Sequence, residues 1–162
     1  MRKRTERMDR VVGAFFLLGS LAAFATDTTW TGAVDDDWNK AGNWSVKVPV
    51  GGDVAYFSNT PNAAVRVTAD ATSILRVTTP LTLTIEAGVT LSLTNSGSEV
   101  FTSSADVTIN GPGTLLSSTA SGDNHADFRP GAGTTLTVNA KVTGTGTSGF
   151  EHNGLGKIVL NN

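Results

Sequence analysis

Apolar and polar residues alternate along most of the second half of the chain. Segments such as AVRVTA, TPLTLTIEA and TLTVNA place an apolar side chain at every second position. This is the period of a β-strand with one buried face. In the strand predicted around residues 81–85, two leucines and an isoleucine face one way and the threonines between them face the other.

The alternating segments also recur behind glycines. AGVTLSLT, GPGTLLSS, GAGTTLTV and GLGKIVLN each join a glycine to a short apolar strand, and these glycines are Gly88, Gly113, Gly133 and Gly156. Their step of about 22 residues suits one coil of a parallel β-helix with about three short strands. A hairpin meander would turn about every 8–12 residues instead. We therefore predict an all-β fold, a right-handed parallel β-helix or solenoid of about four coils over residues 63–162.

Residues 1–25 have the pattern of a secretory signal peptide. MRKRTERMDR holds five basic and two acidic residues, and the uncharged run that follows ends in Ala23-Phe24-Ala25. A basic start, a short apolar run and a small-x-small exit are typical of such peptides. The apolar run is shorter than the ~20 residues that a spanning helix needs. We expect Sec-type export, cleavage after Ala25, and a secreted or cell-surface protein.

The composition beyond residue 25 narrows the class of partner. Seven basic and twelve acidic residues give this part a net charge of −5. Nucleic acid is not expected as a partner, because phosphate binding needs a basic face. The chain has no cysteine, so its core must suffice without disulfides. It also has no second long apolar segment, and we predict no transmembrane segment in the mature chain.

The three tryptophans, Trp30, Trp38 and Trp44, all lie in the stretch TWTGAVDDDWNKAGNWS. The first coil of a solenoid exposes unpaired backbone groups and an apolar stack that must be covered. We predict that residues 26–62 form a Trp-rich N-terminal cap on this coil. The alternative is a set of accessible rings that contacts glycans. Buried tryptophans favour the cap, and exposed ones favour the glycan platform.

The same stretch resembles the opening segment of bacterial autotransporter-associated β-strand repeat proteins. The resemblance rests on W-x-G, a later tryptophan, N-W, V-P and a D-x-A-x-F strand, in that order, and on the closing GLGKIVLNN. The matching residues are Trp30, Gly32, Trp38, Asn43, Trp44, Pro49, Asp53, Ala55 and Phe57. It implies a large exported surface protein with a β-helical passenger, of which this chain would be the N-terminal part.

The chain departs from that family in its length. An autotransporter ends in a membrane β-barrel, and 162 residues leave no room for one. We therefore expect the repeats of residues 63–162 to be truncated at the C-terminus, with the downstream translocator barrel absent from this chain.

Two groups of residues are weak candidates for a metal site. Asp35, Asp37 and Asn39 have the first spacings of an EF-hand calcium loop, but the sixth position is Lys40 and the twelfth is Val46, so the motif fails. The second group alternates in GDNHAD and consists of Asp123, His125 and Asp127. Its imidazole and carboxylates could bind a metal or exchange protons. A loop position between coils is the expected arrangement, and we predict no metal site.

The sequence thus favours a secreted or cell-surface, non-enzymatic β-helical segment with a structural or adhesive role. No nucleophile elbow, P-loop or paired-carboxylate motif occurs. We expect no cofactor and no catalytic residue, with extracellular glycans or surface components as partners. The alternative is a carbohydrate-binding or polysaccharide-degrading β-helix protein that uses its exposed sheet and its tryptophans.

Overall fold

The computed structural model describes residues 25–161, apart from residues 61, 96, 98, 120–124 and 145–148. The predicted signal peptide, except its last residue, lies outside this part. Within the described part the single helical segment is a 3₁₀ turn, η1 (Ala41–Asn43). No helix found there is long and apolar enough to cross a bilayer.

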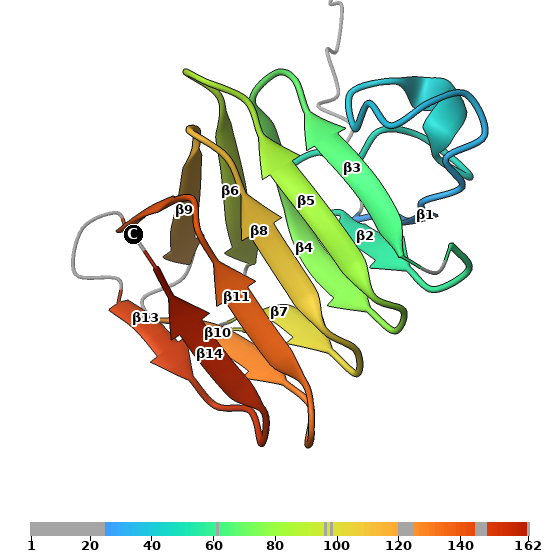
Figure 1. Ribbon diagram of the computed structural model, residues 1–162. Helices are drawn as coiled ribbons and strands as arrows, with labels where there is room; N and C mark the ends of the chain where they lie inside the picture. Colours follow the sequence, from blue (N-terminus) through green and yellow to red (C-terminus); the bar gives the residue numbers. More distant parts are fainter. Residues whose placement is uncertain are drawn as a thin grey trace, which may run out of the picture.

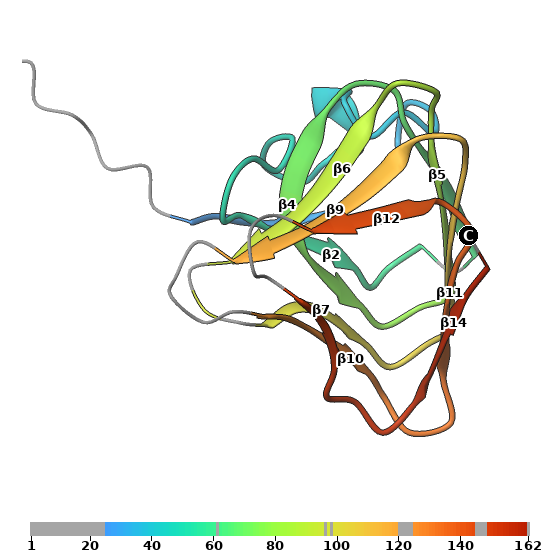
Figure 2. The same cartoon turned by 90° about the vertical axis from the view of Figure 1, so that its left-hand side faces the viewer.

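The described strands wind into a parallel β-solenoid of about five turns, which confirms the predicted fold. Every described pair of strands is parallel, and the partners come from the turns before and after along the chain. The turns enclose the core between three faces, as Figure 2 shows. Figure 1 shows the N-terminal segment at one end of the stack and β13 and β14 at the other.

Each face is a ladder of strands, which we call face I, face II and face III. Face I consists of β1 (Asp27–Thr29), β2 (Val54–Phe57), the second half of β4 (Ala71–Val77), β7 (Glu99–Ser103), β10 (His125–Pro130) and β13 (Gly149–His152). Face II consists of the first half of β4, β6 (Thr90–Asn95), β9 (Thr114–Thr119) and β12 (Lys141–Gly144). Face III consists of β3 (Ala63–Val67), β5 (Leu81–Ile85), β8 (Val107–Asn110), β11 (Thr135–Val138) and β14 (Lys157–Leu160). Because β4 bends through a corner, it joins faces I and II into one sheet of nine strands.

The solenoid begins earlier than the sequence predicted. Val54–Phe57 pairs in register with Ile74–Val77, so β2 is already a rung of face I and not part of the cap. This places the start of the first turn at residue 54 instead of 63. The short strand VAYF follows a loop that contains two glycines, and its alternation is too brief to separate it from the cap by sequence. The earlier start adds one rung to face I.

Inward-facing side chains stack from turn to turn and form the core. On face III one row runs Ala63, Leu81, Val107 and Leu136, all at most 5 % exposed. On face I the rings of Phe101 and Phe128 stack at 5.8 Å, and those of Phe128 and Phe150 at 3.9 Å. Phe150 pairs in register with Ala126, so its ring reaches Phe128 from a diagonal position. Both kinds of stacking remove apolar surface from water, which stabilises the fold by roughly 25 cal/mol per Å².

The four repeat glycines belong to two corners, not one. Gly88 and Gly113 follow face III strands, β5 and β8, whereas Gly133 and Gly156 follow face I strands, β10 and β13. The steps from Gly88 to Gly113 and from Gly133 to Gly156 are therefore true turns. The step from Gly113 to Gly133 joins non-equivalent corners.

The true turns also differ in length. On face III, the step from Ala63 to its partner Leu81 is much shorter than the step from Val107 to its partner Leu136. A prediction that assumes one constant repeat length therefore pairs some residues with the wrong partners on the neighbouring turn.

Candidate functional site

The three tryptophans form one buried cluster at the N-terminal end of the solenoid. Trp30, Trp38 and Trp44 are 2 %, 0 % and 5 % exposed. The ring of Trp44 meets those of Trp30 and Trp38 edge-on, at centroid distances of 5.1 and 4.8 Å. All three rings pack within 6.0 Å of Phe57, on β2 of the first turn. Their faces are covered, so in this arrangement they offer no stacking surface to a sugar.

Backbone hydrogen bonds cover the outer strand edges at the same end of the solenoid. On face I, β1 pairs with β2 and covers its outer edge. On face III, Trp38 N donates to Arg66 O at 2.8 Å, and Arg66 N donates to Asp36 O at 2.7 Å. The two exposed edges therefore receive hydrogen-bond partners from residues 27–38. The segment covers both the apolar end and the sheet edges, which confirms the predicted N-terminal cap.

Asn43 holds the cap loop together, a role that sequence reasoning did not assign. Its side chain is fully buried and accepts hydrogen bonds from the backbone N of Val34 and Asp35, at 2.9 and 3.1 Å. Its Nδ2 donates to Asp35 Oδ1 at 2.7 Å and to Asp37 O at 2.8 Å. The sequence signal was its place in the N-W pair that carries the family resemblance.

The three residues of the incomplete calcium-loop motif serve as hydrogen-bond acceptors for the cap. Asp37 Oδ1 accepts from Asn39 N at 2.9 Å and from Thr68 Oγ1 at 2.7 Å, and Asn39 Oδ1 accepts from Thr68 N at 3.2 Å. Asp35 pairs with Lys40, and this hydrogen bond, followed by that from Asn43, lowers the pKa of Asp35 to about 2. Asp37 and Asn39 therefore dock the loop on the first turn, whereas Asp35 links residues within the loop.

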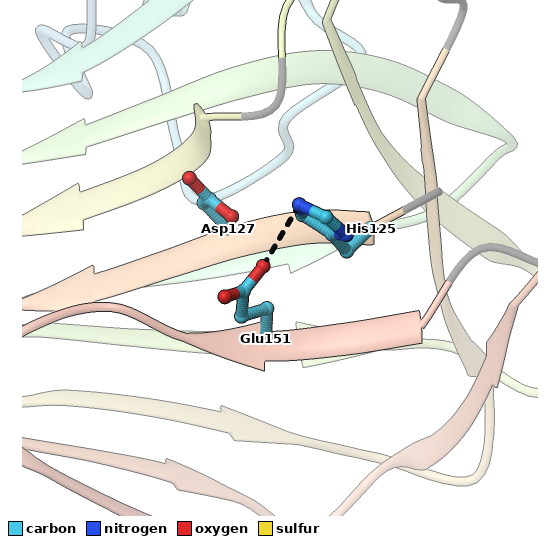
Figure 3. A group of neighbouring side chains, drawn as sticks. All are labelled: His125, Asp127 and Glu151. Atoms are coloured by element: carbon cyan, nitrogen blue, oxygen red, sulfur yellow. Dashed lines mark ion pairs between the residues drawn. The ribbon is translucent and has the colours of Figure 1, made fainter. Parts of the chain in front are cut away.

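The structure brings two residues of the other metal candidate together and adds a third. The predicted loop position of His125 and Asp127 is wrong: both lie on β10, whose backbone pairs with β7 and β13. Glu151 approaches them from β13 on the next turn (Figure 3). His125 Nε2 lies 3.0 Å from Glu151 Oε2, and one ligand atom of each residue falls within 4.8 Å of the others. Asp123 lies outside the described residues. Glu151 was missed because its alignment with Asp127 depends on the register between turns.

A guanidinium competes with any cation at this cluster. The Asp127 side chain is 4 % exposed, and its Oδ2 lies 2.8 Å from Nη2 of Arg129. The hydrogen bond to Asp127 raises the pKa of Arg129, with a smaller contribution from Glu99. Glu99 in turn pairs with Arg76 on the preceding turn, at 2.8 Å. The cluster is therefore the end of a ladder of alternating charges on the outside of face I.

We expect metal ions to leave the stability of the protein unchanged. The side-chain oxygens of Asp35, Asp37 and Asn39 already accept hydrogen bonds from groups of the protein. The Asp127 carboxylate already forms an ion pair with Arg129. Thermal melting should give the same Tm in EDTA, in added Ca²⁺ and in added Zn²⁺. A Tm shift above about 5 °C, roughly 1 kcal/mol for a domain of this size, would contradict this. Abolition of a Zn²⁺ shift by His125→Ala would then locate the site on face I.

Asp53 is a second buried carboxylate that only the family resemblance had singled out. Its side chain is 4 % exposed, just before β2. Oδ1 accepts from Thr26 N at 2.7 Å, and Oδ2 accepts from Val50 N at 2.9 Å and lies 2.8 Å from Lys47 Nζ. Burial acts to raise the pKa of Asp53, but the hydrogen bonds from Lys47, Val50 and Thr26 outweigh it, and the pKa is lowered. This carboxylate anchors the start of the cap to the first turn.

Comparisons of the chain with protein-family models, with curated proteins and with solved structures gave no match. The fold is therefore established by the strand pairing alone, and the resemblance to autotransporter-associated repeat proteins remains a prediction from sequence.

Proposed function

We propose that this chain is a secreted or cell-surface structural segment, a capped β-solenoid with an adhesive outer face. The observation that carries the proposal is a regular polar array on face III. Thr82, Thr108 and Thr137 lie on successive rungs and point outward. Neighbouring strands in a sheet are about 4.8 Å apart, so these hydroxyls recur at a fixed spacing.

An asparagine ladder borders the threonine row. Asn139 Nδ2 donates to Asn110 Oδ1 at 2.7 Å, and Asn161 Nδ2 donates to Asn139 Oδ1 at 2.8 Å. The links hold the amides of three turns in one line. A rigid row of hydroxyl and amide groups binds through many weak contacts with little loss of conformational entropy. This favours extracellular glycans or surface components as partners.

The resemblance supports the same proposal. Trp30, Trp38 and Trp44 are the cap cluster, and Ala55 and Phe57 lie on β2, the rung that the cap covers. The alternative function, a carbohydrate-binding or polysaccharide-degrading protein, would have to use the exposed faces, because the tryptophans are buried.

Export of the full chain tests the first half of the proposal. The chain, with a C-terminal tag, should leave the cytoplasm of a bacterial host, and N-terminal sequencing of the exported protein should begin at Thr26. A matched chain that lacks residues 11–25 should stay in the cytoplasm. Recovery of exported protein with Met1 intact, or of the full chain in the cytoplasm only, would contradict the proposal.

Binding of that exported protein to polysaccharides or to cells tests the second half. The triple variant Thr82→Glu, Thr108→Lys, Thr137→Glu should lose retention, while the face II variant Thr72→Glu, Ser92→Lys, Thr143→Glu should keep it. Alternating signs avoid like charges on adjacent strands. Equal retention of both variants would remove face III as the adhesive surface, and turnover of the polysaccharide would favour the enzymatic alternative.

A further inference from the structure

The backbone nitrogen of Thr26 is held at a buried carboxylate. Thr26 N lies 2.7 Å from Asp53 Oδ1, and the other side of the same residue is fixed because Thr26 O accepts from Val54 N at 3.1 Å. The preceding residue, Ala25, is exposed and belongs to no strand. The bond between Ala25 and Thr26 is also the one at which the signal-peptide pattern predicts cleavage.

We infer that Asp53 is the binding site for the α-ammonium group that cleavage after Ala25 creates at Thr26. This inference rests on the export that we propose. Hydrolysis by an endopeptidase consumes one water and breaks the C–N bond. It leaves a carboxylate on Ala25, and the amine of Thr26 takes up a proton. The new charge arises at an atom that is already at hydrogen-bond distance from the carboxylate.

Cleavage changes the strength of this contact without moving it. Before cleavage, a neutral amide N–H donates to Asp53; afterwards, an ammonium group does. The amide contact is already assisted by the charge of the carboxylate, and the ammonium adds the attraction between two opposite charges. The carboxylate is buried, so solvent screens the pair poorly. Loss of Ala25 opens no cavity because its side chain is exposed.

Lys47 is the charged side chain that shares this carboxylate. It pairs with Oδ2, whereas Thr26 N pairs with Oδ1, so the two cations would occupy different oxygens. Lys47 is 40 % exposed and can turn toward solvent, which limits its repulsion of the new ammonium. Asp27, the next residue, contributes a second negative charge to the same end.

Cleavage after Ala25 should therefore stabilise the cap. β1 begins immediately after Thr26 and covers the outer edge of β2. A stronger bond at Thr26 holds β1 in that position, so the exported, processed chain is the more stable form. In the precursor only the carboxylate is charged, so its contact with Thr26 N is the weaker one.

Three forms of the wild-type chain test the inference, prepared in vitro with chosen N-termini: residues 26–162 with a free amine, the same residues N-acetylated, and residues 24–162. The free amine should raise Tm by about 3–6 °C over both other forms at pH 6. Equal Tm values for the free and acetylated forms would overturn the inference. Because no export is involved, failure here is separate from failure of the localisation experiment.

The pH dependence and an Asp53→Asn variant identify the partner of the amine. An opposite charge raises the pKa of an amine, so the advantage of the free form should be complete below about pH 7.7 and vanish as the pH rises through the raised pKa. It should also fall at acid pH as Asp53 becomes protonated.

In Asp53→Asn, the free and acetylated chains should melt together. Persistence of the difference in this variant would overturn the assignment of Asp53. Should the variant not fold, the pH series on the wild-type forms decides: an advantage that does not change between pH 6 and pH 10 would equally overturn it.

Discussion

Trp44→Ala should destabilise the protein by roughly 3–5 kcal/mol, the usual range for removal of a large buried aromatic side chain. The Trp44 ring packs edge-on against Trp30 and Trp38 and contacts Phe57. Its Nε1 also donates to Trp38 O at 2.7 Å, and this buried acceptor would lose its partner. The loss is a large part of the roughly 5–15 kcal/mol that a domain of this kind possesses.

Chemical denaturation measures this loss, and light scattering should show aggregation through the uncovered sheet edges. The matched control is Val46→Ala, close by in the sequence and 65 % exposed, which should change stability by less than about 0.5 kcal/mol. A stable and soluble Trp44→Ala protein that no longer binds glycan would show that the tryptophans serve binding and not the cap.

Gly113→Ala should cost about 3 kcal/mol or more, at or beyond the upper end of the range for overpacked sites. A Cβ at this position would lie 2.4 Å from Glu86 O and 2.7 Å from Val89 O, both backbone atoms of the preceding turn. Gly113 N donates to Ile85 O at 3.1 Å, and the next residue, Thr114, donates to Val89 O. The turns would have to separate, which breaks these hydrogen bonds.

Alanine substitutions at two other glycines serve as controls for the stability loss at Gly113. Gly88, at the same corner one turn earlier, has φ +78° and open space, so Gly88→Ala should cost only the roughly 1–2 kcal/mol of a left-handed backbone. Gly52 has open space and no such φ, and its replacement by alanine should be neutral or slightly stabilising. Equal losses at Gly113 and Gly88 would mean that backbone conformation, not close approach, selects glycine at this corner.

The candidate sites were less predictable than the fold. The clustering of the tryptophans in the sequence indicated a cap, because three large apolar rings close together can cover the apolar end of a solenoid. The role of Asn43 depends on four partners that the loop brings together only when folded. The cluster on face I was not predicted: the sequence favoured a loop for His125 and Asp127, which lie on β10, and Glu151 joins them from the next turn of the solenoid.

Most of the strands and the solenoid class could be predicted from the sequence, since alternation at period two selects strands and the recurrence of glycine-strand units selects coils. Both are local or periodic properties that one chain displays directly. The register between turns, by contrast, is visible only in the tertiary structure. There the glycines belong to two corners, β2 is part of the first turn, and Thr26 N lies at hydrogen-bond distance from Asp53. The reason is that successive turns contain unequal lengths of chain. Which residues become neighbours thus depends on how each corner packs on the turn below it, and no constant period encodes that.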